Sequence, residues 1–261
     1  MAKESFFKPF YSVLVLAFVC SFLVSLASVG LRPLQEANRE MERKKNILLA
    51  AGLYKEGADI DTLFERIEPK IIDLETGEFV PEDQLSPADY DQLAAANDPK
   101  LSRKLAKDQD LAGIRRLEKY SLVYLIKDRD GNLAQIVFPV RGKGLWSTMY
   151  GYVALDKDLN TIVGLAFYEH GETPGLGGEI ENPAWLAGWH GKKLFDDKGR
   201  VKLTVVKGVS RATGEAAAYE VDGLSGATLT GDGVTRLFHF WFDGQGFGPF
   251  IDRMRKEVQH G

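Results

Sequence analysis

The longest apolar stretch of the chain covers residues 10–31 and contains no charged side chain. A helix needs about 20 apolar residues to cross the hydrocarbon core of a bilayer, so a transmembrane helix is predicted near the N-terminus. A cleaved signal peptide is the alternative, because Ser25-Leu26-Ala27 would serve as a small-residue cleavage site. The apolar stretch continues beyond that site, which favours a retained anchor.

Between residues 35 and 118, some segments have the apolar spacing of a helix and others have that of a strand. Gly52 would close a first helix, and Ser86 with Pro87 would begin another, as N-cap and first helical residue. Strand spacing occurs on both sides of Glu75-Thr76-Gly77. The predicted helices are residues 35–51, 61–67 and 86–96, and the two strands lie within residues 70–80.

After residue 119 strand patterns dominate and are separated by polar turns. Residues 120–126 and 133–140 predict one hairpin, and residues 149–155 and 161–168 predict a second pair. A further strand is expected at 202–206, and helices at 231–242 and 250–258. Because strands follow their neighbours and the helices come between and after them, we predict an α+β fold with an antiparallel sheet and peripheral helices.

Composition excludes several classes of function. The net charge of −4 leaves no basic excess to neutralise nucleic-acid phosphates. Cys20 is the only cysteine, so no intramolecular disulfide can form, and a cysteine-ligated metal is not expected. The four histidines (His170, His190, His239 and His260) show no ligand spacing. We therefore expect no metal site.

Glycine is concentrated in three stretches between predicted elements, residues 142–151, 171–178 and 223–233. Each stretch alone is most simply a tight turn. Together they also contain Trp146, Glu172, Thr173 and Thr228, and such loops commonly hold ligands. No P-loop or dinucleotide-binding glycine motif is present, and Ser225 lacks the surroundings of a nucleophile elbow.

Residues 222–228, with the sequence D-G-L-S-G-A-T, resemble the D-G-x-[ST]-G-A-T acceptor of proteins that carry FMN on threonine through a phosphoester bond. An accessible hydroxyl suits this modification, and Gly226 and Ala227 leave the approach to it clear. The following helix start would favour the remaining phosphate charge. Asp222 could assist the transfer by recruiting a metal of the modifying enzyme. The alternative is that Ser225 or Thr228 only caps a helix.

Further segments resemble the NqrC family of the bacterial sodium-translocating NADH:quinone oxidoreductases, and the likeness extends from the apolar segment to the C-terminus. These are GKGLWSTMYGY at 142–152, ETPGLGGE at 172–179, NPAW at 182–185, VKG at 206–208 and GFGPF at 246–250. The Rnf complex contains a related protein, RnfG, to which these segments are less similar.

The resemblance implies a membrane-anchored electron-transfer subunit of the sodium-transporting NADH:ubiquinone reductase, a translocase, with FMN bound covalently to Thr228. Its implied partners are the other subunits of a six-subunit complex and a flavin transferase. Residues expected near the flavin are Ser225, Gly226, Ala227, Trp146, Glu172, Thr173, Gly175, Leu176 and Lys207. Neither a catalytic residue nor a metal ligand is implied. Trp146 is equally compatible with a core aromatic, and Lys207 with a solvated surface lysine.

This resemblance also implies three parts of the chain and a location. Residues 1–33 would form a cytoplasmic N-terminus and transmembrane anchor, 34–118 a membrane-proximal α+β region and 119–261 the FMN-binding domain. The protein would be a single-pass bacterial inner-membrane protein with its large domain in the periplasm. Basic residues favour the opposite orientation, because only Lys3 and Lys8 precede the apolar stretch, whereas Arg32, Arg39, Arg43, Lys44 and Lys45 follow it.

Two other functions remain open from the sequence. An Rnf-type subunit would have the same flavin chemistry with a different electron donor and acceptor. A membrane-anchored binding module without a cofactor would use the three glycine stretches only as turns. A flavin colour that remains with the denatured protein would exclude the binding module without a cofactor.

Overall fold

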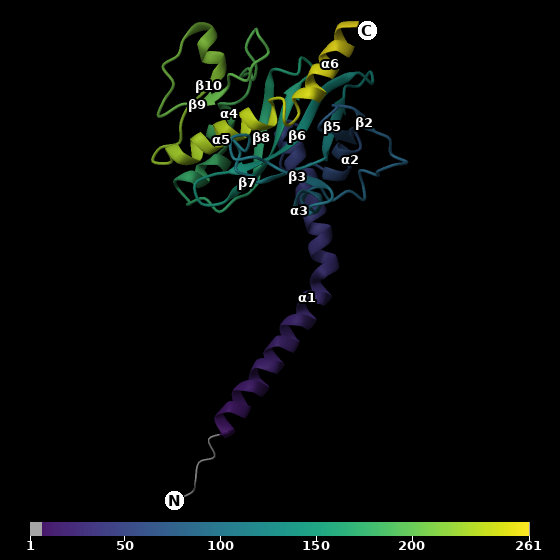
Figure 1. Ribbon diagram of the computed structural model, residues 1–261, viewed down its shortest axis with the longest axis vertical. Coiled ribbons are helices and arrows are strands. Elements are labelled where there is room, and N and C mark those ends of the chain that lie inside the picture. The colour runs from purple at the N-terminus through teal and green to yellow at the C-terminus, as the bar shows by residue number, and fades with distance from the viewer. Residues whose placement is uncertain (1–6, 261) are drawn as a thin grey trace, which may run out of the picture. The chain divides into compact units, whose positions relative to one another are not determined.

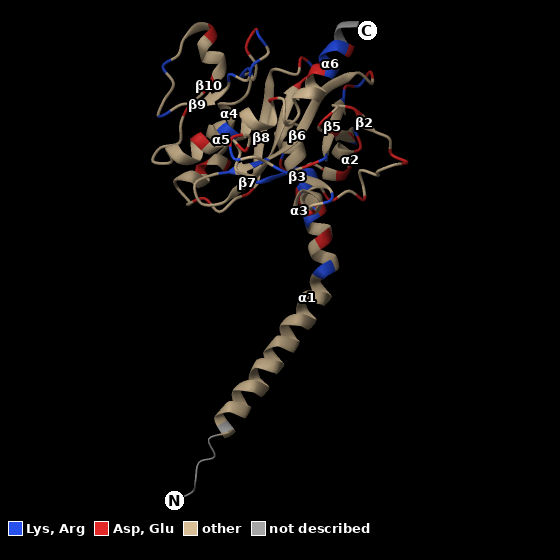
Figure 2. Ribbon diagram, in the orientation of Figure 1, with Lys and Arg blue, Asp and Glu red and all other residues tan. Residues whose placement is uncertain are grey.

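The computed structural model describes residues 7–260 and begins with a long helix, α1, Phe7–Ala50. By length and composition α1 qualifies as a membrane span, with a mean hydropathy of 2.5 in its most apolar window. Figure 2 shows that charged residues are concentrated toward its C-terminal end. The predicted cytoplasmic N-terminus, including Lys3, lies outside the described residues. The chain divides after Arg43 into two units, and every strand among the described residues belongs to the second unit, residues 44–261.

A six-stranded sheet forms the framework of the second unit (Figure 1). Neighbouring strands are antiparallel throughout, which confirms the predicted sheet and both hairpins after residue 119. In spatial order the strands are β2 (Phe79–Val80), β1 (Ile67–Asp73), β5 (Tyr120–Lys127), β6 (Leu133–Lys143), β7 (Thr148–Asp156) and β8 (Ile162–Glu169).

Both faces of this sheet are buried. Val137 and Phe138 follow each other on β6, yet Val137 belongs to one apolar cluster and Phe138 to the other. The end of α1, with Ile47 and Leu48, covers the face of Val137. Phe238 on α5 (Thr228–Trp241) packs on the opposite face, which α6 (Gly248–His260) also covers. Strands with two buried faces lose the alternation of apolar and polar residues, which explains the nearly continuous apolar runs of β5 to β7.

Short elements surround the sheet, and some of them differ from the predictions. The helix predicted at 86–96 is α3, Gln92–Asn97, capped by Asp91, which accepts a hydrogen bond from the Ala94 amide at 2.9 Å. The Ser86 hydroxyl instead accepts a hydrogen bond from the Ala88 amide within a separate turn. The remaining elements are α2 (Ile60–Phe64), β3 (Ser102–Lys104), β4 (Arg116–Glu118), α4 (Pro183–Ala187), β9 (Thr204–Val205), β10 (Glu220–Val221) and the 3₁₀ helices η1 (Gly177–Glu181) and η2 (Gly214–Tyr219).

Two further predictions were too long. The helix predicted at 61–67 ends at Phe64, because the chain enters β1 at Ile67. The strand predicted at 202–206 is reduced to β9, which pairs in parallel with β10 outside the main sheet. Strands as short as β9 and β10 contain too few residues to show the alternating apolar pattern of a strand. Their length is set by pairing with a segment distant in the sequence.

Segments on both sides of residue 118 are joined by a buried ion pair. Arg141 on β6 donates two hydrogen bonds to the carboxylate of Glu118 on β4, at 2.8 and 2.5 Å. The Glu118 side chain is fully buried, and Arg141 is 8% exposed. Gln92 donates a further hydrogen bond to Glu118, at 2.7 Å. Together with the β1–β5 pairing, this contact makes residues 44–261 one compact unit.

The turn between β7 and β8 supplies a pH-dependent contribution to stability. Burial would raise the pKa of Asp158, but hydrogen bonds from Thr161, Asn160 and Lys193 outweigh burial and lower the pKa to about 2. A lowered pKa stabilises the fold above the unfolded value near 4, and this stability is lost as the pH falls toward 2. The side chain is 42% exposed, so solvent screening limits the contribution to about 1 kcal/mol.

We therefore expect Asp158→Asn to lower the free energy of unfolding by about 1 kcal/mol at pH 7, with the difference from wild type vanishing near pH 2. Denaturant titrations of the full chain at several pH values measure this difference. Asp130→Asn, an exposed change in the β5–β6 turn, serves as the control and should shift stability equally at each pH. A constant difference for Asp158→Asn across the acid range would contradict the assignment.

Candidate functional site

The structure brings the three glycine-rich stretches together. Residues 144–147 connect β6 to β7, residues 170–176 follow β8, and residues 222–227 lead into α5. Glu172, in the second stretch, accepts hydrogen bonds from the first stretch and from Thr230 on α5. The Ser147 hydroxyl also accepts a hydrogen bond from the Gly171 amide. These loops therefore form one surface at the N-terminus of α5.

Glu172 is the centre of this arrangement. Its Oε1 accepts from the amides of Trp146 at 2.9 Å and Ser147 at 3.1 Å. Its Oε2 accepts from the Leu145 amide at 3.2 Å and the Thr230 hydroxyl at 2.7 Å. The residue is only 5% exposed. Burial alone would raise the pKa of this carboxyl, but the four donors outweigh burial and hold the pKa below its usual value.

Close packing between the stretches explains several glycines. A side chain at Gly226, whose φ is +70°, would lie 2.9 Å from Cδ2 of Leu176. One at Gly177 would lie 2.6 Å from the Thr230 hydroxyl oxygen, and one at Gly233 would lie 2.6 Å from the Lys143 carbonyl oxygen. Glycine at these positions allows the first and second stretches to approach the segment of residues 226–233 closely.

Thr228 is the first residue of α5, three residues before the predicted start of this helix. Its side chain is exposed, and so is that of Ser225. The N-cap is Ala227, which provides no side-chain capping bond, and the first turn contains no acidic residue. Neither Ser225 nor Thr228 caps the helix, so this alternative from the sequence is wrong. α5 thus begins at an exposed threonine and has no side chain that caps the amide groups of its first turn.

Apolar side chains lie exposed on the same loops and in the first turn of α5. Trp146 is 67% exposed, so it is not a core aromatic. Leu176 is 43% exposed, and Leu145 and Leu229 are also exposed. Thr173 is exposed, and its carbonyl oxygen accepts hydrogen bonds that close the turn around residue 175. Exposed apolar groups gathered around polar ones are typical of a ligand or partner site.

A fourth segment, residues 207–210, contacts the segment that precedes Thr228. Asp222 accepts a hydrogen bond from the Ser210 amide at 2.8 Å, and the Gly223 amide donates to the Gly208 carbonyl oxygen at 2.6 Å. Lys207 is exposed and makes no side-chain hydrogen bond or ion pair with the described residues. The sequence did not indicate Ser210, because a single serine in a polar loop carries no pattern.

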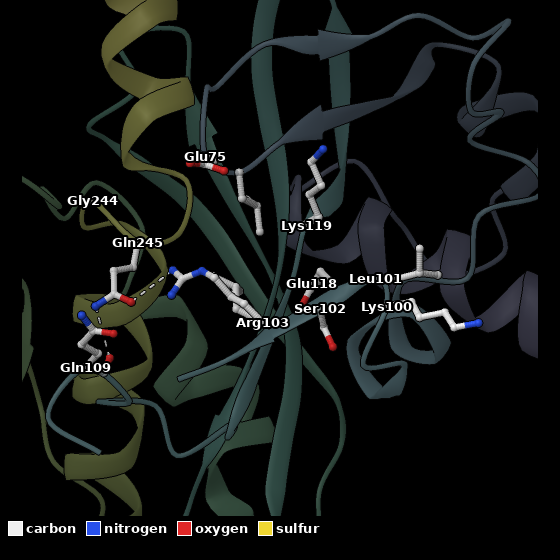
Figure 3. A pocket seen from close by; sticks show the side chains of 12 residues that line it. Glu75, Lys100, Leu101, Ser102, Arg103, Gln109, Glu118, Lys119, Gly244 and Gln245 are labelled. Carbon is white, nitrogen blue, oxygen red and sulfur yellow. Dashed lines mark hydrogen bonds between the residues drawn. The ribbon is translucent and has the colours of Figure 1, made fainter. Parts of the chain in front are cut away.

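A pocket of about 530 Å³ lies elsewhere, beside β3 and β4 (Figure 3). Its cationic side chains do not converge: Arg103 points toward Gln245, at 3.3 Å, whereas Lys100 and Lys119 point in other directions. This arrangement offers no common anion site. In residues 7–260 no group of three or more His, Cys, Asp and Glu side chains is arranged to hold a metal ion.

Comparisons with known proteins identify an FMN-binding domain in the region around Thr228. The family described as FMN-binding domain matches residues 144–243, which include all the loops around Thr228. The NqrC protein of the Na(+)-translocating NADH-quinone reductase from Vibrio campbellii is 47% identical over 256 residues, covering 97% of each chain. Its counterpart from Pseudomonas aeruginosa is 45% identical over 258 residues, covering 97% of this chain and 98% of the relative.

Solved structures give the same result. A crystal structure of NqrC from Shewanella oneidensis is similar with a TM-score of 0.77 and 39% identity, over 84% of this chain and 99% of that one. The corresponding protein from Parabacteroides distasonis gives a TM-score of 0.64 at 28% identity, over 85% of this chain and 96% of that one. With such similarity over nearly its whole length, the chain belongs to the NqrC family of Na(+)-translocating NADH-quinone reductase subunits.

Proposed function

We propose that this protein carries FMN as a phosphoester on Thr228 and transfers electrons within the sodium-pumping complex. The observation that carries the proposal is the position of Thr228, an exposed hydroxyl in the D-G-L-S-G-A-T segment at the first residue of a 14-residue helix. That helix lacks a side-chain cap. A phosphate on Thr228 would accept hydrogen bonds from the free amides of the first turn and interact favourably with the helix dipole.

Surrounding residues fit the rest of a flavin mononucleotide. We propose that Trp146 and Leu176 pack against the flavin ring, because both are exposed apolar side chains on loops joined to α5. Lys207 is available to pair with the phosphate, since its ammonium group has no other partner among the described residues. The remaining residues proposed for the site are Thr173, Gly175, Ser225, Gly226 and Ala227.

Bound FMN supplies one- and two-electron redox chemistry. The protein's own contribution is to fix the position of the flavin and to control its solvent exposure. Because attachment through the phosphate leaves the ring unmodified, nearby hydrogen bonds and charges would set its redox potential. A covalent bond also prevents loss of FMN by dilution, which matters for a domain outside the cytoplasm.

Within the complex we propose that this subunit passes electrons between neighbouring cofactors and binds neither NADH nor sodium itself. Sodium export, a six-subunit assembly and maturation by a flavin transferase belong to this proposal. Its support is membership of the NqrC family and the candidate membrane helix. The family match also sets aside the Rnf-type alternative, and the FMN-binding domain match disfavours a module without a cofactor.

The direct test is chemical. The full chain is expressed together with a flavin transferase, denatured, digested and analysed by mass spectrometry. We expect a flavin mass on the peptide that contains Thr228, and a yellow colour that remains with the denatured chain. Expression without the transferase is the control and should give colourless protein. A flavin that is lost on denaturation, or one attached to another residue, would overturn the proposal.

We also propose that residues 1–33 comprise the cytoplasmic N-terminus and the anchor, and that the large domain lies in the periplasm. A reporter enzyme active only outside the cytoplasm, fused after Gly261, should therefore be active. The same reporter fused before Met1 is the matched control and should be inactive. The opposite pattern would show that the basic residues after the apolar stretch determine the orientation.

A further inference from the structure

Three successive backbone amides of the β6–β7 loop bind one carboxylate. The amides of Leu145, Trp146 and Ser147 all donate to Glu172. Successive amides that converge on one point form a small anion-binding concavity. In this chain a carboxylate of the protein itself fills the concavity, so these amides are not available to another anion.

The loops are built around this carboxylate. A side chain at Gly144 would lie 2.5 Å from Oε1 of Glu172, and one at Gly177 would lie 2.8 Å from its Oε2. A side chain at either position would therefore displace the Glu172 carboxylate from its hydrogen bonds. Glycines of the first and second stretches thus both make room for the buried Glu172 carboxylate.

The fourth hydrogen bond extends the arrangement to the acceptor helix. Thr230, which is fully buried, donates to Oε2 of Glu172 from a position two residues after Thr228. The carboxylate therefore connects the backbone of the loop that carries Trp146 to the first turn of α5. No other residue described in the structure bonds to both.

We propose that Glu172 is a positioning residue, which fixes Trp146 relative to Thr228 through backbone and hydroxyl hydrogen bonds and does not touch the flavin. The flavin-related part rests on the function proposed above. Four donors already occupy both carboxylate oxygens, and the residue is almost fully buried. Glu172 was predicted from the sequence to lie near the flavin, and its contact partners give it this indirect role.

Glu172→Gln tests the proposal because it preserves the shape of the side chain. Its NH₂ group replaces one acceptor oxygen and faces at least one backbone N–H, so a donor opposes a donor. In the full chain without flavin, we expect the amides of residues 145–147 to exchange hydrogen about tenfold faster than in wild type. Mass spectrometry of deuterium uptake measures this exchange. Glu169→Gln, an exposed change at the end of β8, should leave the exchange unchanged.

The role of Thr230 is tested separately. Thr230→Val removes the hydroxyl and keeps the branched shape, whereas Thr230→Ser keeps the hydroxyl. We expect Thr230→Val to leave most of the amide protection of residues 145–147 intact but to change the circular dichroism of the attached flavin. Thr230→Ser should match the wild-type dichroism. Equal dichroism in Thr230→Val and wild type would overturn the coupling between the loop and α5.

Flavin attachment to Glu172→Gln provides the final readout. With the transferase in excess, we expect attachment to Thr228 to be about tenfold slower than in wild type, while thermal unfolding confirms that the variant is folded. Wild-type amide exchange and attachment in Glu172→Gln would overturn the positioning role. If wild type itself carries no flavin on Thr228, the proposed function fails, but the amide-exchange result still decides whether Glu172 organises the loop.

Discussion

Thr228→Val is expected to give a folded protein without covalent flavin. Valine keeps the β-branched shape of threonine but has no hydroxyl, and the phosphoester cannot form without that oxygen. Because the Thr228 side chain is exposed and caps nothing, the free energy of unfolding should change by less than about 0.5 kcal/mol. Mass spectrometry of the denatured protein and denaturant titration measure the two effects.

Two neighbouring variants serve as controls for this result. Thr228→Ser keeps a hydroxyl at the first position of α5, so it should still accept flavin, although more slowly. Ser225→Ala removes the other exposed hydroxyl of the acceptor motif and should leave Thr228 modified. A flavin mass that persists in Thr228→Val, or its disappearance only in Ser225→Ala, would show that the acceptor has been assigned to the wrong residue.

Arg141→Met is expected to destabilise the protein by about 3–5 kcal/mol, because it leaves the buried Glu118 carboxylate without its cation. Among the described residues, Gln92 would then be the one remaining donor to the Glu118 carboxylate. Arg141 also lies over the Trp241 ring, with its Cζ 5.2 Å from the ring centroid, so the tryptophan environment should change as well. Denaturant titration followed by tryptophan fluorescence measures the loss.

An exposed ion pair provides the comparison. Arg200→Met breaks the pair between Arg200 and Asp196, in which the Arg200 side chain is 71% exposed, and should cost about 0–1 kcal/mol. The double variant Glu118→Leu with Arg141→Met removes both buried charges and should be more stable than Arg141→Met alone. If Arg141→Met loses no more stability than Arg200→Met, the buried pair does not hold the two segments together.

Local signals account for the features that the sequence predicted correctly. The hairpins after residue 119 follow from apolar runs separated by turns such as that of Asp128, whose carboxylate accepts from the Asp130 and Asn132 amides. The apolar helix follows from an uninterrupted stretch without charge. Residues 222–228 are likewise contiguous, so their position at a helix start was predictable, although the helix begins three residues earlier than expected. Their role in holding the flavin stays a prediction.

Features that depend on distant partners were not predictable in the same way. Ser86 and Asp91 are both good N-cap residues, and local preference alone cannot choose between them. In the fold, Tyr90 donates to the Tyr120 carbonyl oxygen, and Gln92 bonds to Glu118 and Ser121. These contacts hold residues 90–92 against β4 and β5, so α3 begins at Gln92 and not directly after Ser86. The β1–β5 pairing is also non-local, and it places strands from both sides of the predicted boundary at 118 in one sheet.

By itself the sequence determined an anchor-like helix and an antiparallel α+β fold, and it indicated Thr228 as a candidate site, because each of these is encoded in contiguous residues. Only the tertiary structure decided the contacts of Glu172, on which its proposed role rests. Its donors lie between 25 and 58 residues away, and they meet it only after β6, β8 and α5 have packed together. A buried carboxylate needs nearly all its acceptor sites filled, and no local pattern shows which distant amides will fill them.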